Sequence, residues 1–327
     1  MHNPLHTPIC DLFGIKYPIV LAGMGGVSTA PLVAAVSNAG GLGVIGAATM
    51  DAERLRDQIH KTRDLTDKPF AVDLLAPIPD RIRPQIEVIF EEGVRIFVAG
   101  LAVPGDFIDE MHKRGMIVAV MCGRVRHAQK SEQAGADVVA AQGTEAGGHT
   151  GEIGTMALVP QVVEAVHIPV LAAGGIVDGR GVVASLALGA QGAVIGTRFV
   201  ASEESQAAQG YRQAIVDAHD DSTMRTRAYT GKPARTIKTD YAEEWEKKAD
   251  EIQAFPMQAG ISVQQGVMDY MGHTPIFDAH RTFLPAGQGS GLIHDIKPAA
   301  EIFADIVREA EGVIRDKFRL SQHTPAK

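Results

Sequence analysis

Eight short runs of apolar residues, each bounded by turn-forming residues, recur along the first two thirds of the chain. Such runs are typical of strands buried on both faces, because no polar residue alternates with the apolar ones. Both faces of a strand are buried when a parallel sheet is covered by helices. The runs occupy residues 18–24, 43–48, 70–75, 95–101, 117–122, 138–143, 169–175 and 192–199.

Each of the first seven runs is followed by a stretch with helix-like character, and many of these stretches end on glycine, which tolerates the left-handed helix stop. Eight strand and helix units at intervals of about 25 residues predict a closed (β/α)8 TIM barrel. The segment GLGVIG at residues 41–46 formally matches a dinucleotide-binding fingerprint. Its glycines end a helix and lead into a strand, however, so we expect a barrel and not a Rossmann fold.

The pattern changes after the eighth run, where residues 203–290 become polar and irregular. We expect an FMN-binding barrel formed by residues 1–205 plus 291–327, with residues 206–290 as a smaller, mostly helical inserted lid domain. This insert holds Trp245 and four of the five tyrosines, which either line a site under a lid or form a small core of their own. From Ile293 onward, the periodicity indicates a final amphipathic helix on the barrel wall.

Composition and charge exclude several classes of function. The 327 residues are 45% hydrophobic and 21% charged, with a net charge of -8 and no basic tail, which argues against nucleic acid as a partner. No signal-like start and no long uncharged apolar stretch is present, so we expect a cytoplasmic protein without a membrane contact. Cys10 and Cys122 are far apart and are expected to be reduced thiols. The histidine spacings predict no metal site.

Glycines gather where four of the expected strands end, which is the end of such barrels that carries the reacting groups. Glycine lets backbone N–H groups approach a ligand, and the loops after the seventh and eighth strands commonly hold phosphate. A phosphorylated cofactor is therefore implied. Residues 178–180 open the following helix, and the dipole of its N-terminus would favour an anion there as well.

Three segments carry a resemblance to a known family. Residues 14–46 (GIKYPIVLAGMGGVSTAPLVAAVSNAGGLGVIG), 141–151 (AQGTEAGGHTG) and 169–199 (PVLAAGGIVDGRGVVASLALGAQGAVIGTRF) resemble the nitronate monooxygenase family, formerly called 2-nitropropane dioxygenases. Related FMN-dependent enoyl-acyl-carrier-protein reductases and NADH:quinone reductases share these motifs. The resemblance implies an FMN-dependent oxidoreductase. The residues that it places at the cofactor are Ala22, Gly23, Met24, Asp73, Gln142, Gly147, Gly148, Ala173, Gly174, Gly175, Gly196 and Thr197.

The resemblance also implies that His149 is the catalytic residue. An imidazole titrates near neutrality, so it could abstract the proton next to a nitro group or hold a nitronate anion. Glu145 is as consistent with a structural pairing as with a catalytic task. Asp73 stands where many relatives have asparagine. An ionised aspartate accepts hydrogen bonds but cannot donate them, which leaves its contact with the flavin open.

Four functions are consistent with these residues. The first is FMN-dependent oxidation of alkyl nitronates or nitroalkanes by molecular oxygen to a carbonyl compound and nitrite. The second is NAD(P)H-dependent reduction of enoyl thioesters or quinones. The third is a tailoring step in a biosynthetic pathway, and the fourth is a barrel that only binds a phosphorylated ligand. The sequence does not specify the oligomeric state.

Overall fold

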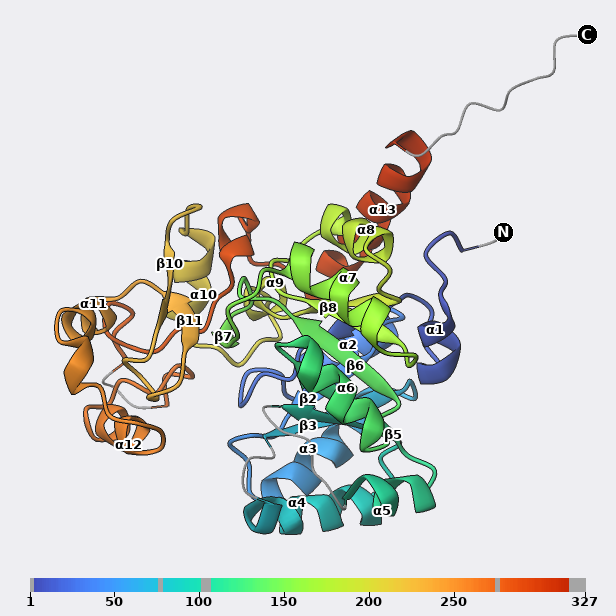
Figure 1. Cartoon of the computed structure of the whole chain (residues 1–327), viewed down its shortest axis with the longest axis horizontal. Coiled ribbons are helices and arrows are strands. Elements are labelled where there is room, and N and C mark those ends of the chain that lie inside the picture. Colours follow the sequence, from blue (N-terminus) through green and yellow to red (C-terminus); the bar gives the residue numbers. More distant parts are fainter. Residues whose placement is uncertain (1–2, 76–78, 101–106, 274–276, 318–327) are drawn as a thin grey trace, which may run out of the picture.

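The eight apolar runs form one parallel sheet that curls into a barrel (Figure 1). A computed structural model describes residues 3–75, 79–100, 107–273 and 277–317, so Leu101 of the fourth run and the last ten residues lie outside the described part. The strands are β1 (Ile19–Leu21), β2 (Gly43–Gly46), β3 (Phe70–Leu75), β4 (Ile96–Gly100), β5 (Ile117–Cys122), β6 (Val138–Gln142), β8 (Val170–Ala173) and β9 (Gly192–Ile195).

The strand order confirms the predicted TIM barrel. Neighbours follow one another as β1-β9-β8-β6-β5-β4-β3-β2, and every pairing is parallel. A parallel bridge between Val20 and Leu42 closes the gap between β1 and β2. Two backbone hydrogen bonds hold this seam: Leu21 N donates to Leu42 O at 2.9 Å, and Leu42 N donates to Ile19 O at 3.0 Å. All carboxyl ends of the strands therefore face the same side of the barrel.

Helices cover the outside of the sheet, as the periodic stretches predicted. They are α2 (Ala30–Asn38), α3 (Ala52–Leu65), α4 (Pro79–Glu91), α5 (Phe107–Lys113), α6 (Val125–Gln133), α7 (Thr155–Ala165) and α8 (Gly179–Ala187), followed by the short α9 (Thr197–Val200) and the terminal α13 (Ala299–Lys317). A further helix, α1 (Pro8–Phe13), precedes β1.

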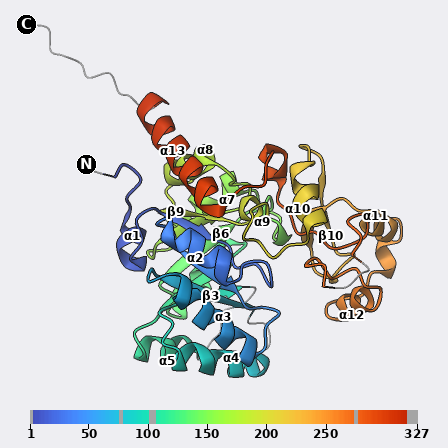
Figure 2. The same ribbon diagram turned by 180° about the vertical axis from the view of Figure 1, so that it is seen from behind.

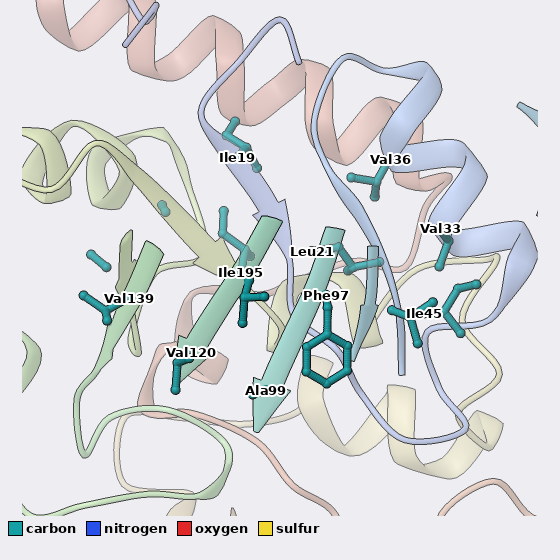
Figure 3. Close-up of a cluster of buried hydrophobic side chains, with 14 of the residues drawn as sticks. Ile19, Leu21, Val33, Val36, Ile45, Phe97, Ala99, Val120, Val139 and Ile195 are labelled. Atoms are coloured by element: carbon teal, nitrogen blue, oxygen red, sulfur yellow. The ribbon is translucent and has the colours of Figure 1, made fainter. Parts of the chain in front are cut away.

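The strands separate two hydrophobic cores. Side chains that point outward pack against the helices, as Figure 3 shows for Val33 and Val36 of α2 beside Ile45 of β2. Side chains that point inward form a second cluster, which includes Val20 and Phe13. Because α1 contributes Phe13 to this inner cluster, the helix fills the amino end of the barrel and leaves the carboxyl end for the site.

The segment after α9 lies to one side of the barrel in both views (Figures 1 and 2). It contains α10 (Gln209–Val216), β10 (Thr223–Thr226), β11 (Ala234–Ile237), α11 (Asp240–Glu246), η1 (Ala249–Glu251), α12 (Met257–Gln264) and η2 (Gln288–Leu292). The strands β10 and β11 form a small antiparallel sheet together with β7 (Gly148–His149), which comes from the loop after β6.

Aromatic residues of this segment divide between two environments. Tyr229, Tyr241 and Phe283 pack together, with ring centroids 5.0 Å apart for the tyrosine pair and 4.7 Å apart for Tyr229 and Phe283, and Trp245 packs beside them. Tyr211 and Tyr270 instead pack in a separate cluster with residues of the barrel. Tyr229, Tyr241 and Trp245 therefore belong to a small core of the segment itself, whereas Tyr211 and Tyr270 pack towards the barrel.

The final helix α13 packs on the barrel wall against α8 and α2 (Figure 2). Its approach to α8 depends on Gly179, the first residue of that helix. A Cβ at Gly179 would lie 2.3 Å from the backbone nitrogen of Ala310 and 2.5 Å from the carbonyl oxygen of Ile306. Neither backbone atom can rotate away, so the absence of a side chain permits this contact.

Gly179→Ala is therefore expected to lower the free energy of unfolding by about 1–3 kcal/mol, the usual cost of overpacking. Gly312→Ala is the matched control, because the added Cβ on α13 would meet only the end of Arg315 at 3.7 Å. Replacing this helical glycine should raise stability by ~0.5–1 kcal/mol. Urea denaturation followed by circular dichroism measures both. Equal stability of Gly179→Ala and wild type would show that α13 shifts without cost.

Candidate functional site

A cavity of about 400 Å³ opens at the carboxyl ends of the barrel strands. The structure brings all the sequence-predicted site residues together around it, although they come from six different parts of the chain. The lining includes Ala22, Gly23, Met24, Asp73, Gln142, Gly147, Gly148, His149, Ala173, Gly174, Gly175, Gly196 and Thr197. Below them, inward-facing strand residues such as Val98 and Leu171 make its deeper wall apolar.

Glycines at the rim allow the loops to lie against one another. Gly174 and Gly175, after β8, have positive φ angles of 107° and 72°, which L residues with side chains rarely adopt. A Cβ at Gly147 would lie 2.9 Å from Cα of Ala286, on the segment that returns from the insert to the barrel. Larger residues at these positions would force the loops apart and change the shape of the cavity.

His149 is held by a strand pairing that joins the barrel to the insert. It pairs with Ala234 of β11, and Gly148 pairs with Arg235, in antiparallel register. The buried Arg235 adds a hydrogen bond from Nε to the carbonyl oxygen of Thr144 at 2.8 Å. From the barrel side, Gln142 Nε2 donates to His149 O at 3.2 Å. The backbone of His149 is therefore fixed from both sides.

The imidazole of His149 is neutral at physiological pH. Burial lowers its pKa to about 4, and the positive charge of the nearby Lys232 acts in the same direction. Its Nε2 lies 2.9 Å from Oγ1 of Thr230, a residue of the insert. The side chain is thus a neutral hydrogen-bonding group in a largely apolar cavity, with a cation close by.

Glu145 has a structural role at the N-terminus of α7. Its carboxylate accepts hydrogen bonds from the backbone nitrogen of Thr155 at 2.9 and 3.0 Å and from the Thr155 hydroxyl at 2.9 Å. Thr155 is the first residue of α7, and a negative charge is favourable at a helix N-terminus. Glu145 therefore ties the loop between β6 and β7 to α7.

Asp73 lies near the end of β3 and is 7% exposed. One oxygen, Oδ1, has no hydrogen-bond partner among the described residues. Burial raises the pKa of this carboxyl to about 7, and the backbone N–H of Gly100 opposes the rise more weakly. This carboxyl is therefore only partly ionised near neutral pH.

The anion site expected at α8 is already occupied by carboxylates of the protein, whereas Cys122 is a buried free thiol, as expected from the sequence. The N-terminus of α8 does not offer an anion site, since Gly181 N donates to Asp178 at 3.0 Å and Gly179 N donates to Glu309 at 2.8 Å. Cys122 packs in the outer core, outside the lining of the cavity, and burial raises the pKa of its thiol to about 11. The thiol is therefore protonated and unreactive.

The described residues contain neither a metal centre nor a membrane-spanning helix. Within them, no group of three or more histidine, cysteine, aspartate and glutamate side chains is arranged to hold a metal ion. In the same residues, no helix is both long and apolar enough to span a bilayer.

The insert contributes residues to the cavity that the sequence did not assign to the site. They include Thr230, Met268 and Phe283, and also Tyr211 and Tyr270, for which the sequence had left a place at the site as one of two alternatives. Tyr270 donates from its hydroxyl to the carbonyl oxygen of Gly25, at 2.9 Å, and so contacts the loop after β1. The concentration of tyrosines in the insert was the available signal, but periodicity could not show which of them face the barrel.

The motifs and the geometry agree with three comparisons. The nitronate monooxygenase family model matches residues 6–309. A probable nitronate monooxygenase of Staphylococcus saprophyticus is 38% identical over 300 residues, covering 78% of this chain and 84% of that protein. The (3aS,4S,5R,7aS)-5-hydroxy-7a-methyl-1-oxo-octahydro-1H-indene-4-carboxyl-CoA dehydrogenase of Rhodococcus jostii is 34% identical over 341 residues, covering 94% of this chain and 96% of that protein.

A similar solved structure is FabK from Thermotoga maritima. It superposes with a TM-score of 0.88 at 39% sequence identity and covers 96% of this chain and 98% of that one. The similarity therefore extends through the insert as well as the barrel. Family model, relatives and fold agree that this chain belongs to the nitronate monooxygenase family and is a flavin-dependent oxidoreductase.

Proposed function

We propose that this protein uses FMN to oxidise alkyl nitronates with molecular oxygen, forming a carbonyl compound and nitrite. The observation that carries the proposal is the environment of His149, a neutral imidazole beside a lysine at a largely apolar cavity. A nitronate has a matching structure, because it combines an apolar alkyl group with a delocalised negative charge on its two oxygens.

The cavity has the features that FMN requires. Its apolar strand residues suit an aromatic ring, while Asp73 and Gln142 provide polar groups for the edge of that ring. The glycine loops after β8 and β9, together with Thr197, would hold the phosphate. When bound, FMN supplies a centre that exchanges electrons with substrate and oxygen.

His149 would orient the substrate, and Lys232 would attract its negative charge. A neutral imidazole has a single N–H, which the hydrogen bond to Thr230 uses, so the other ring nitrogen can only accept a hydrogen bond. A base whose pKa lies near 4 abstracts protons poorly from neutral nitroalkanes. The site should therefore prefer a nitronate that has already lost its proton.

Thr230 would position the histidine by selecting its tautomer. The hydroxyl of Thr230 donates to the carbonyl oxygen of Lys232 at 3.1 Å. Because this hydroxyl has a single hydrogen, it can then only accept from Nε2–H of His149, at 2.9 Å. This tautomer leaves Nδ1 unprotonated. Residues 206–290 would thus act as a lid domain that also completes the site.

A second candidate function is that of an NAD(P)H-dependent reductase. In this function NAD(P)H would reduce the flavin, and the flavin would then reduce an enoyl thioester or a quinone. Its support is the carboxyl-CoA dehydrogenase relative, whose similarity covers 94% of this chain. The apolar wall of the cavity is compatible with an acyl group as well as with an alkyl nitronate.

The deciding experiment compares these substrates in the FMN-loaded enzyme. With ethyl nitronate, we expect oxygen consumption and equimolar nitrite, slower turnover of neutral nitroethane, and no requirement for NAD(P)H. Oxygen electrode and nitrite assays measure these rates. NAD(P)H oxidation that depends on an enoyl thioester or a quinone, with nitronate inert, would establish the reductase instead.

His149→Ala is expected to lower kcat/KM for the nitronate by ~10²–10⁴-fold, the range of acid-base and hydrogen-bonding assistance by a positioned side chain. The flavin content should not change. His167→Ala is the control, because the side chain of His167 is 99% exposed. Full turnover of His149→Ala would exclude a role for the imidazole.

Thr230→Val removes the hydroxyl at nearly constant volume and is expected to lower kcat about threefold to tenfold, in line with one hydrogen bond. Thr230→Ser should restore the rate. The ¹⁵N resonances of the His149 imidazole give an independent readout: wild type should show hydrogen on Nε2, and Thr230→Val a mixture of tautomers. Hydrogen on Nδ1 in the wild type would contradict the assignment.

A further inference from the structure

Asp73 is a buried carboxyl group whose protonation state the proposed function leaves open. It lines the cavity, yet no described residue satisfies its Oδ1. Its other oxygen faces Gly23 so closely that a Cβ there would lie 2.2 Å from Oδ2. Gly23 therefore makes room for a carboxyl group that would be more stable in water. The carboxyl lines the cavity although Oδ1 itself is buried, so a ligand that forms a hydrogen bond with this carboxyl would offset the cost of burying it.

Within the described part of the chain, no charged group stabilises an ionised Asp73 in this position. In the sheet, its neighbours in register are Gly46 of β2 and Val98 of β4, neither of which has an ionisable side chain. The loop after β1 presents Gly23. Among the described residues, no lysine or arginine contributes to the pKa of Asp73, which burial dominates.

The other titratable side chains around the cavity are also neutral near pH 7. Burial lowers the pKa of His149 to about 4 and raises the pKa values of Tyr211 and Tyr270. None of them offers a positive charge to the carboxylate. Covering the cavity with an aromatic ring would remove more water from Asp73 and favour its neutral form further.

A neutral carboxylic acid matches the polar edge of a flavin. That edge presents carbonyl acceptors on either side of an N–H donor. The neutral acid offers one O–H donor and one carbonyl acceptor, whereas the carboxylate offers acceptors alone. An ionised Asp73 could accept a hydrogen bond from this N–H but would have no hydrogen to donate to the carbonyl groups on either side of it.

We propose that Asp73 binds the flavin ring as a neutral carboxylic acid, so that ionisation of Asp73 weakens the binding of FMN. This inference rests on the proposed use of FMN. The direction of the pH dependence follows from the protonation state of Asp73. The acid form predominates at low pH, so the affinity for FMN should fall as rising pH ionises Asp73 in the apoprotein.

The test is a titration of the apoprotein with FMN, followed by quenching of flavin fluorescence. A range of about pH 7 to 9 avoids the second ionisation of a phosphate monoester, near pH 6. In wild type, Kd should increase with pH and approach an increase of about tenfold per pH unit, as expected when one proton must be bound for FMN to bind. In Asp73→Asn, which keeps a donor and an acceptor without a charge, Kd should be independent of pH.

An infrared difference spectrum of the FMN complex provides a direct second readout. Wild type should show the carbonyl band of a protonated carboxylic acid, and Asp73→Asn should lack it. A flat Kd in wild type, a Kd that falls with rising pH, or the same slope in Asp73→Asn would each overturn the inference. Absence of FMN binding to wild type at every pH would refute the proposed cofactor, and this inference with it.

Discussion

The pairing of β7 with β11 is the interaction on which the site depends. It joins two residues from a loop of the barrel to a strand of the inserted segment, Ala234 to His149 and Arg235 to Gly148. A glycine-rich loop has many accessible conformations, and backbone hydrogen bonds to a neighbouring strand select one of them. Through this pairing, residues far apart in the sequence fix where the imidazole lies relative to the barrel.

The low polarity of the cavity then determines the charge of its side chains. Burial disfavours the charged form of every group, so it lowers the pKa of His149 and raises that of Asp73. These opposite shifts have the same physical cause and the same result, which is a cavity with little charge of its own. Charges carried by a substrate or cofactor therefore have a large influence on protonation in this site.

Local sequence signals were sufficient for the barrel and for the residues that surround its open end. The eight apolar runs became eight strands, and the glycines at their ends met around one cavity. The same signals did not identify Thr230 or decide the place of Tyr270, since a residue of the insert reaches the site only through the path of the whole insert. They also suggested an anion site at α8, which the carboxylates of Asp178 and Glu309 occupy instead.

The sequence by itself determined the fold class and the set of residues at the strand ends, because periodicity and glycine placement act over a few neighbouring residues. The family came from the resemblance of three segments to known proteins. Only the tertiary structure decided the states of those residues: His149 neutral and bonded to Thr230, Glu145 bound to α7, and Asp73 without a partner. Hydrogen bonding and desolvation depend on which groups are brought together in space, and the linear order of residues does not contain that information.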